Sequence, residues 1–484
     1  MDRKILLVSI FIATFMTSVE TTVVTTALPA IISNLHGLSM QSWVFAIYLL
    51  TTAIATPIYG KLSDSIGRKS VFLIGLLLFT IGSFLCGFAT NMYLLIIFRA
   101  LQGIGAGAIR PITFTIIADM FSFQERSKIM ALNNTAWGIS ALAGPLLGGF
   151  IVDKLSWHWI FFINVPLGII IFLLILFGFN ENFAKADNLK IDYSGIGLLT
   201  VVLLLMLLSL QSLGNTRLNV TLFISGITVF IISLYLFIKI ERRSRDPLIP
   251  LDMFKSQTFT IQVLTALLMS GMQIGFQIYF PMWIQSIYQK SPSVAGLAIT
   301  PSPIMWLVAS FFTGALIKKF APKFIIITIV IVQMIFYLIL VFNSANMPVV
   351  WFYIISGVTG SGLGIIITMN TVIAQELVDD KSVGTASSML TLGITLGQTI
   401  MTGIFGLIFN VSINHNLAEF PQVSTAHLNQ AISSNSNVRT TDISAINHIL
   451  LGSFHNVYIA VLVIFVLLIF LNLRDKQKQP INSK

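Results

Sequence analysis

Residues 60–69 read Gly-Lys-Leu-Ser-Asp-Ser-Ile-Gly-Arg-Lys and directly follow an apolar segment long enough to cross a membrane. Residues 314–323, Gly-Ala-Leu-Ile-Lys-Lys-Phe-Ala-Pro-Lys, follow another such segment 254 positions later. A short run of small and basic residues is typical of the inner connection between two membrane helices. Its recurrence indicates that the chain is built from two similar halves.

The composition requires lipid as the main solvent. Of 484 residues, 56% are hydrophobic and 10% are charged, with a mean hydropathy of +0.90. Soluble domains carry about 25% charged residues, so this chain could not cover a water-facing surface. The single cysteine, Cys86, excludes a disulfide framework and a cysteine metal cluster. The first apolar segment is too long for a signal peptide, so we expect it to be the first membrane span.

Fourteen segments meet the requirement of about twenty mostly apolar residues for a transmembrane helix. They are residues 5–30, 42–60, 70–89, 92–118, 128–152, 159–179, 194–214, 219–238, 257–287, 294–317, 324–343, 348–375, 384–412 and 452–473. The predicted fold class is therefore an all-α membrane protein with fourteen transmembrane helices.

The net charge of +10 is explained by topology, and it requires no nucleic-acid partner. With a cytoplasmic N-terminus, 22 of the 28 Lys and Arg residues fall on the cytoplasmic side, 4 fall outside and 2 are embedded. This bias follows the positive-inside rule and predicts that both termini are cytoplasmic. With an odd number of spans, Lys and Arg would no longer be concentrated on one side of the membrane, so the charges favour fourteen spans over thirteen.

Further landmarks recur in the same order in the two halves. The matched sets are Gly103, Gly105 and Gly107 with Gly360, Gly362 and Gly364, then Asp119 with Glu376, then Ala131, Gly138 and Gly148 with Ala386, Gly393 and Gly403. Together they indicate two six-helix bundles in parallel orientation. We expect the first bundle at 1–180, a linker with two extra helices at 181–254, and the second bundle at 255–484. A long polar outer loop is expected at about 413–451, and its histidines are read as solvated rather than as a metal or pH sensor.

Glu20 is the only acidic residue well inside an expected helix, and Arg99 lies at a similar depth in the fourth. An ionisable residue inside a span is costly and therefore suggests function. A buried carboxylate either finds a partner or takes up a proton. Glu20 is thus a candidate coupling or substrate-binding acid, with a purely structural ion pair as the alternative. The sequence leaves open whether Arg99 pairs with it.

Arg110 lies eleven residues after Arg99, on the same helix face. It could reach the lipid headgroups, pair with Asp119, or line a path for substrate. In the stretch 60–69, Gly60 and Gly67 allow unusual backbone angles, Asp64 could cap a helix, and Arg68 could pair with Asp119. With Lys69, these residues predict a gate on the cytoplasmic side.

Two further helices carry candidate residues. The fifth holds Gly144, Pro145, Gly148 and Gly149, where Pro removes a backbone donor and Gly permits close helix packing. The ninth holds a possible adaptable pocket, against the alternative of plain packing. Its residues are Met269, Met272, Gln273, Gln277 and Trp283.

Several kinds of site are missing from the sequence. No phosphate-binding loop of the ATPase type occurs, the Gly-rich runs lie in apolar helices rather than between strand and helix, and no His-Glu-x-x-His metal motif is present. We therefore expect that this protein is not an enzyme and binds no cofactor and no metal.

At the level of whole motifs, the chain resembles the major facilitator superfamily, and within it the fourteen-helix drug:proton antiporters of Gram-positive bacteria. Residues 60–69 resemble the superfamily's loop signature, and 20–29 and 157–166 resemble two signatures of the fourteen-helix group, with Glu20 where Asp is usual and His158 where Arg is common. The residues resembling the fourth-helix motif are Leu95, Arg99, Gln102, Gly103 and Gly105, and those resembling the fifth-helix antiporter motif are Gly144, Pro145, Gly148 and Gly149, with Ser140 in place of Gly.

This resemblance implies two six-helix bundles and export of lipophilic or cationic drugs in exchange for protons by alternating access. A dedicated exporter of a metabolite, lipid, peptide or antibiotic is the alternative, and uptake symport or a membrane sensor is less favoured. The second half has no embedded acid, which favours monocationic, zwitterionic or neutral substrates over polycations. The expected setting is the plasma membrane, with small-molecule substrate, protons and lipid as the partners of a monomer.

Overall fold

The computed structural model describes residues 3–120, 123–179, 181, 193–213, 220–242, 251–343, 347–378, 383–432 and 443–476. Every regular element within these ranges is a helix, which confirms the predicted all-helical class. Twelve helices in the described part are long and apolar enough to cross a membrane. The fifth and seventh predicted spans coincide with α5 (Phe123–Lys154) and α8 (Tyr193–Leu213), which are not among these twelve. The count of fourteen spans therefore stays a prediction.

The chain divides into two compact units. One comprises Met1–Leu205 and Ile227–Leu248, and the other comprises Met206–Gly226 and Ile249–Lys484. The division passes through α8 and α9 (Val220–Glu241), the two helices that the sequence places outside the repeat.

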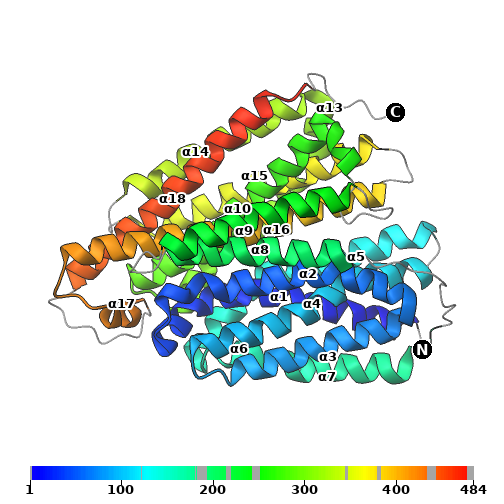
Figure 1. Cartoon of the computed structure of the whole chain (residues 1–484), viewed down its shortest axis with the longest axis horizontal. Coiled ribbons are helices and arrows are strands. Elements are labelled where there is room, and N and C mark those ends of the chain that lie inside the picture. Colours follow the sequence, from blue (N-terminus) through cyan, green and yellow to red (C-terminus); the bar gives the residue numbers. More distant parts are fainter. Residues whose placement is uncertain are drawn as a thin grey trace. The chain divides into compact units, whose positions relative to one another are not determined.

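The first unit is a bundle in which α4 packs against both α2 and α3, and α1 packs against α5. Figure 1 shows these helices in blue to teal. Their bounds are α1 (Arg3–Leu35), α2 (Gln41–Ile66), α3 (Arg68–Gly87), α4 (Met92–Met120), α5 (Phe123–Lys154), α6 (Trp159–Phe162) and α7 (Asn164–Gly178), with a 3-10 turn at Leu38–Met40.

The second unit repeats this arrangement: α15 packs against α12 and α14, and α10 packs against α16. Its helices are α10 (Gln257–Ser286), α11 (Pro292–Ile299), α12 (Pro301–Ser310), α13 (Thr313–Lys319), α14 (Pro322–Phe342), α15 (Val350–Glu376), α16 (Val383–Glu419), α17 (Thr425–Ala431) and α18 (Ile443–Leu473), after a 3-10 turn at Leu251–Lys255.

The repeated glycines have the same packing role in both units. A Cβ on Gly103 would lie 2.5 Å from the Tyr48 carbonyl oxygen of α2, whereas one on Gly105 would lie 2.2 Å from the Phe79 nitrogen of α3. Their matches behave alike, since a Cβ on Gly360 would meet α12 and one on Gly362 would meet α14. The alternating glycines therefore let one helix approach two neighbours closely.

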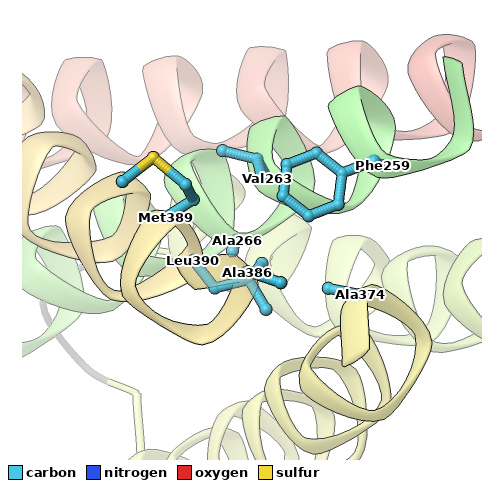
Figure 2. Close-up of a cluster of buried hydrophobic side chains, with 7 residues drawn as sticks. All are labelled: Phe259, Val263, Ala266, Ala374, Ala386, Met389 and Leu390. Atoms are coloured by element: carbon cyan, nitrogen blue, oxygen red, sulfur yellow. The ribbon is translucent and has the colours of Figure 1, made fainter. Parts of the chain in front are cut away.

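An apolar cluster joins three helices of the second unit (Figure 2). Side chains from α10 pack against small and aliphatic residues of α15 and α16, so these helices are held by close packing. The cluster comprises Phe259, Val263, Ala266, Ala374, Ala386, Met389 and Leu390.

Large apolar side chains are exposed on many described helices. Phe177, Phe311 and Phe342 are 79%, 78% and 83% exposed. A water-facing surface rarely presents so much apolar area, whereas a lipid-facing surface requires it. The exposed side chains thus agree with the lipid solvent inferred from composition.

Three local expectations need correction. The connection expected at 60–69 is almost entirely helical, because α2 continues to Ile66 and α3 begins at Arg68. Only Gly67 lies between them, with φ 92°, a conformation that favours glycine. A Cβ on Gly60 would meet nothing within 4 Å, so Gly60 is not needed for close packing.

The other corrections concern the second unit. The tenth predicted span is broken into α11, α12 and α13, and Pro301, which lacks a backbone N–H, begins α12. The stretch 413–451 contains the end of α16, all of α17 and the start of α18. Residues 433–442 of that stretch lie outside the described part of the chain.

Candidate functional site

Glu20 and Arg99 form a fully buried ion pair in the first unit. Arg99 Nη1 lies 2.5 Å from Glu20 Oε1, and neither side chain is exposed. Glu20 lies in the middle of α1, and Arg99 lies in the N-terminal part of α4, next to the glycines that bring α4 close to α2 and α3. The pair that the sequence left open is therefore present.

Arg99 is held by more than the carboxylate. Its Nε donates to the Val44 carbonyl oxygen of α2 at 3.0 Å, and its Nη1 donates to Gln102 Oε1 at 2.9 Å. The guanidinium carbon lies 4.2 Å from the centre of the Tyr48 ring, a cation–π distance. These contacts would keep Arg99 in place if the Glu20 charge were removed.

Ser83 is the centre of a wider polar network. Gln102 Nε2 donates to Ser83 Oγ at 3.0 Å, and Ser83 donates to the Phe161 carbonyl oxygen at 2.9 Å. Asn164 Nδ2, at the start of α7, contacts both Ser83 Oγ at 3.0 Å and Glu20 Oε2 at 2.7 Å. Both carboxylate oxygens of Glu20 are therefore hydrogen-bonded, and the network joins α1, α2, α3, α4, α6 and α7.

This arrangement can exist in two charge states. A paired carboxylate and guanidinium satisfy each other in a low-dielectric interior, and removing either charge leaves the other uncompensated. The carboxylate alone can become neutral, by taking up a proton, because arginine keeps its charge. The network can therefore respond to protonation of Glu20.

Ser83 and Asn164 were missed as site residues. Asn164 lies in the 157–166 signature, which was a usable signal, but an Asn or Ser in an apolar helix is common. The separation of Asn164 from Glu20, 144 positions, left the contact invisible in the sequence.

The gate region near Gly67 is tied to the end of α7. Glu181, three residues beyond α7, accepts hydrogen bonds from the backbone N–H groups of Arg68 at 2.8 Å and Lys69 at 3.0 Å. Lys69 Nζ donates to the Leu176 carbonyl oxygen at 2.8 Å. A carboxylate on the first N–H groups of a helix satisfies orphan donors and the helix dipole. The sequence predicted Asp119 as the partner of this region, and its side chain lies outside the described residues. The acid that contacts the start of α3 is Glu181, which the sequence analysis did not single out.

Replacing Glu181 with alanine is expected to lower the free energy of unfolding by about 1 kcal/mol, the usual cost of losing a helix cap. Glu181→Gln should lose less, because its amide oxygen can still accept. The measurement is equilibrium unfolding in detergent, with the exposed Glu419→Ala as control. An equal loss in both alanine variants would contradict the capping role.

In the second unit, the start of α14 is held by a comparable set of hydrogen bonds. Lys323, which matches Lys69 in the repeat, donates from Nζ to the Asp475 carbonyl oxygen at 3.4 Å. Asp475 is only 3% exposed, and its carboxylate accepts from Thr258 at 2.9 Å and from Gln262 at 3.4 Å. The sequence placed Asp475 in a polar tail beyond the last span. It is buried because, directly after α18, it lies against the first turns of α10 and α14.

Three further predicted site residues lie on described helices. Arg110 and Asp119 lie on α4 and Asp64 lies on α2, but their side chains are outside the described part of the structure. The alternatives for Arg110 therefore stay open.

The fifth-helix glycines lie where α5 meets α1. A Cβ on Gly144 would lie 1.8 Å from Thr22 Oγ1, and one on Gly148 would lie 2.5 Å from the Val23 carbonyl oxygen. Thr22 also donates to the Ser140 carbonyl oxygen at 3.3 Å, so the two backbones are close. The helix runs on through Pro145 and includes Gly149.

Gly144→Ala is expected to destabilise the first unit by about 1–3 kcal/mol, because the added methyl group overlaps Thr22. Gly138→Ala is the matched control on the same helix, since its Cβ would meet nothing within 4 Å. Its gain in helix propensity should leave stability unchanged or up to about 1 kcal/mol higher. Thermal unfolding of both variants decides. If Gly144→Ala unfolds at the wild-type temperature, α5 can move away from α1 without cost, and the predicted overlap is wrong.

The predicted α10 residues are mostly interior. Met269, Met272, Gln273 and Trp283 are buried, whereas Gln277 is partly exposed. Met272 Sδ accepts a hydrogen bond from the Tyr337 hydroxyl at 3.4 Å. No group of His, Cys, Asp and Glu suited to a metal ion occurs among the described residues.

Two units with repeated helix packing, a lipid-facing apolar surface and a buried ion pair define a multi-pass membrane transporter. The chain belongs to the Major Facilitator Superfamily, whose family model matches residues 10–402.

Known proteins agree with this assignment. Multidrug resistance protein 3 of Bacillus subtilis (strain 168) is 34% identical over 413 residues, covering 84% of this chain and 80% of the relative. The multidrug efflux pump SdrM of Staphylococcus aureus (strain N315) is 32% identical over 417 residues, covering 83% and 91%. The fold matches that of a bacterial homolog of the human lysosomal transporter Spinster, in an inward-facing and unoccupied conformation, with TM-score 0.69, 15% identity and 98% of both chains covered.

Proposed function

We propose that this protein is a proton-coupled exporter of lipophilic or cationic drugs that works by alternating access. The observation that carries the proposal is the buried Glu20–Arg99 pair, which is hydrogen-bonded directly to α2 and α7 and, through Gln102, to α3. The relatives named as a multidrug resistance protein and a multidrug efflux pump support drugs as the substrate class.

In this mechanism Glu20 carries the exchanged proton. The deprotonated carboxylate is held by Arg99 and Asn164, and protonation removes the charge that Arg99 binds. Arg99 then keeps its hydrogen bonds to Val44 and Gln102, so the first unit stays folded when Glu20 is protonated. The protonated and deprotonated forms are therefore two folded arrangements of the same unit. A proton entering from outside and a substrate leaving the cytoplasm would each favour one arrangement.

The remaining parts of the proposal follow from the sequence. Fourteen helices in the plasma membrane, with both termini cytoplasmic, satisfy the charge bias. The proposed halves are 1–180 and 255–484, with 181–254 as linker. Residues 60–69 and Asp119 form a cytoplasmic gate, and the fifth-helix glycines support movement of α1 against α5. The protein acts as a monomer, with protons as coupling ion and without cofactor or enzymatic activity.

The test is transport in everted vesicles with an imposed proton gradient, acid inside. Ethidium and a panel of lipophilic drugs should accumulate, and collapse of the gradient by a protonophore should stop accumulation. Accumulation that is indifferent to the gradient would refute proton coupling. A folded protein that moves none of the panel would instead favour a dedicated exporter, to be sought among metabolites, lipids and peptides.

A further inference from the structure

The second unit repeats the polar network of the first unit without its charges. In the first unit Gln102 of α4 bonds Ser83 of α3. The repeat offsets of 257 and 254 positions place Thr359 and Tyr337 at the equivalent sites. The hydroxyl groups of these two residues lie 3.1 Å apart, so the same two helices are joined by neutral groups.

The position of Arg99 is also occupied by a neutral residue in the second unit. Arg99 donates to the Val44 carbonyl oxygen of α2 at 3.0 Å. Its counterpart 257 positions later is Ser356, whose hydroxyl donates to the Ile299 carbonyl oxygen at 3.0 Å. The scaffold is conserved between the halves, but the guanidinium is replaced by a small hydroxyl group.

Aromatic rings surround this neutral network. The rings of Trp283 and Phe454 are nearly parallel, with centroids 5.5 Å apart and an interplanar angle of 8°. Tyr458 lies 5.6 Å from Trp283 and 5.9 Å from Tyr337, centroid to centroid. The cluster therefore joins α10, α14 and α18 through ring contacts.

Tyr279 joins this cluster through Phe409, whose ring centroid lies 5.3 Å from that of Tyr279 and 5.4 Å from that of Phe454. Among the residues that the structure describes, Trp283 Nε1 and the hydroxyl groups of Tyr279 and Tyr458 are buried without a hydrogen-bond partner. Buried polar groups are nearly always paired, and each unpaired one needs an explanation. Tyr279 and Trp283 are four residues apart and so share one face of α10. The indole N–H can only donate, and a tyrosine hydroxyl can donate or accept, so an acceptor would satisfy all three groups.

We propose that Trp283, Tyr279 and Tyr458 form a substrate site for uncharged planar aromatic molecules that carry hydrogen-bond acceptors. The inference rests on the proposed function, because it names the substrate class of an exporter. A flat ring would pack against these aromatic side chains, while a carbonyl or ether oxygen would accept from their donor groups. Because the three side chains are 0–1% exposed, binding at this site requires the second unit to rearrange around them.

The division of labour between the halves follows from charge. The first unit holds the ion pair that can exchange a proton, whereas no carboxylate contacts the three aromatic donors among the described residues. A cation in this cluster would lack a counter-charge. Neutral substrate recognition in one half is therefore separate from proton exchange in the other.

The experiment measures equilibrium binding to purified protein in lipid nanodiscs. The probes are a neutral fluorescent coumarin, which is planar and has a lactone carbonyl, and tetraphenylphosphonium, which is charged and has no acceptor. Trp283→Phe, Tyr279→Phe and Tyr458→Phe keep the rings and remove one donor each. Each should weaken coumarin binding about three- to tenfold, the usual value of one hydrogen bond. Tetraphenylphosphonium binding should not change.

Matched controls remove the same groups at exposed positions, with Trp159→Phe and Tyr93→Phe. These should leave binding of the coumarin unchanged. Thermal unfolding of the three variants tests whether the donors are unpaired in the free protein. Removing an unpaired buried donor should leave the unfolding temperature unchanged or raise it, whereas removing a donor with a partner inside the protein should lower it. Unchanged coumarin binding in all three variants, or equal weakening of both probes, would overturn the proposal.

Transport distinguishes this site from the proposed function. If wild-type protein binds the coumarin but shows no gradient-driven export, the exporter proposal fails and the site remains. If tetraphenylphosphonium is exported and the coumarin does not bind, the exporter proposal stands and the site is wrong.

Discussion

Arg99→Ala is expected to lower the free energy of unfolding by about 3–5 kcal/mol, the cost of removing one partner of a buried ion pair. The variant loses the Glu20 salt bridge, the bonds to Val44 and Gln102, and the contact with the Tyr48 ring. The Glu20 carboxylate would then be buried with Asn164 as its remaining donor. Equilibrium unfolding in mixed detergent measures the loss.

Two variants make this measurement specific. Arg474→Ala removes an exposed arginine and should change stability by less than about 0.5 kcal/mol. Adding Glu20→Gln to Arg99→Ala should recover part of the loss, because no unpaired carboxylate remains. The single variant should also be more stable in acid than in alkali, since a protonated carboxyl needs no cation. A loss that is independent of pH and of Glu20 would show that Arg99 acts mainly by filling space.

Glu20→Gln is expected to reduce gradient-driven export at least about tenfold while the protein remains folded. The amide has nearly the same size, and its oxygen can still accept from Arg99, so the stability loss should be about 1–3 kcal/mol. The amide cannot take up or release a proton, so the exchange step is lost. Vesicle transport, normalised to the amount of folded protein, measures the effect.

Exchange without a gradient provides the control for this variant. Glu20→Gln vesicles preloaded with substrate should still exchange it for labelled substrate, because that step needs alternating access but no proton transfer. Glu419→Gln, an exposed acid, should transport as wild type. Full gradient-driven export by Glu20→Gln would assign coupling elsewhere, first to Asp64 and Arg68 in the gate region.

The sequence predicted the features that depend on local composition. A run of apolar residues must be helical in lipid, because each backbone group needs an internal partner, and this gave the all-helical class. The alternating glycines from Gly103 predicted close packing, and a Cβ at each would overlap a neighbouring helix. Glu20 and Arg99 were identified because charge is rare in such segments.

Boundaries were harder to predict where polar residues extend a helix. Residues 61–66 look like a loop in composition, yet they complete the last turns of α2. Hydropathy reports where lipid ends, whereas a helix ends only where its backbone hydrogen bonds end. For the same reason Asp475, which lies after the last apolar segment, was not expected to be buried.

By itself, the sequence determined that this chain crosses a membrane, that its halves repeat, and which few charged residues are costly enough to require a role. Only the tertiary structure decided their partners: Asn164 and Ser83 for the Glu20 network, Glu181 for the start of α3, and Thr258 for Asp475. Lipid solubility depends on each segment alone. These side-chain contacts join residues 81 to 217 positions apart, so they depend on how distant helices rotate and pack against one another, and no local pattern encodes that choice.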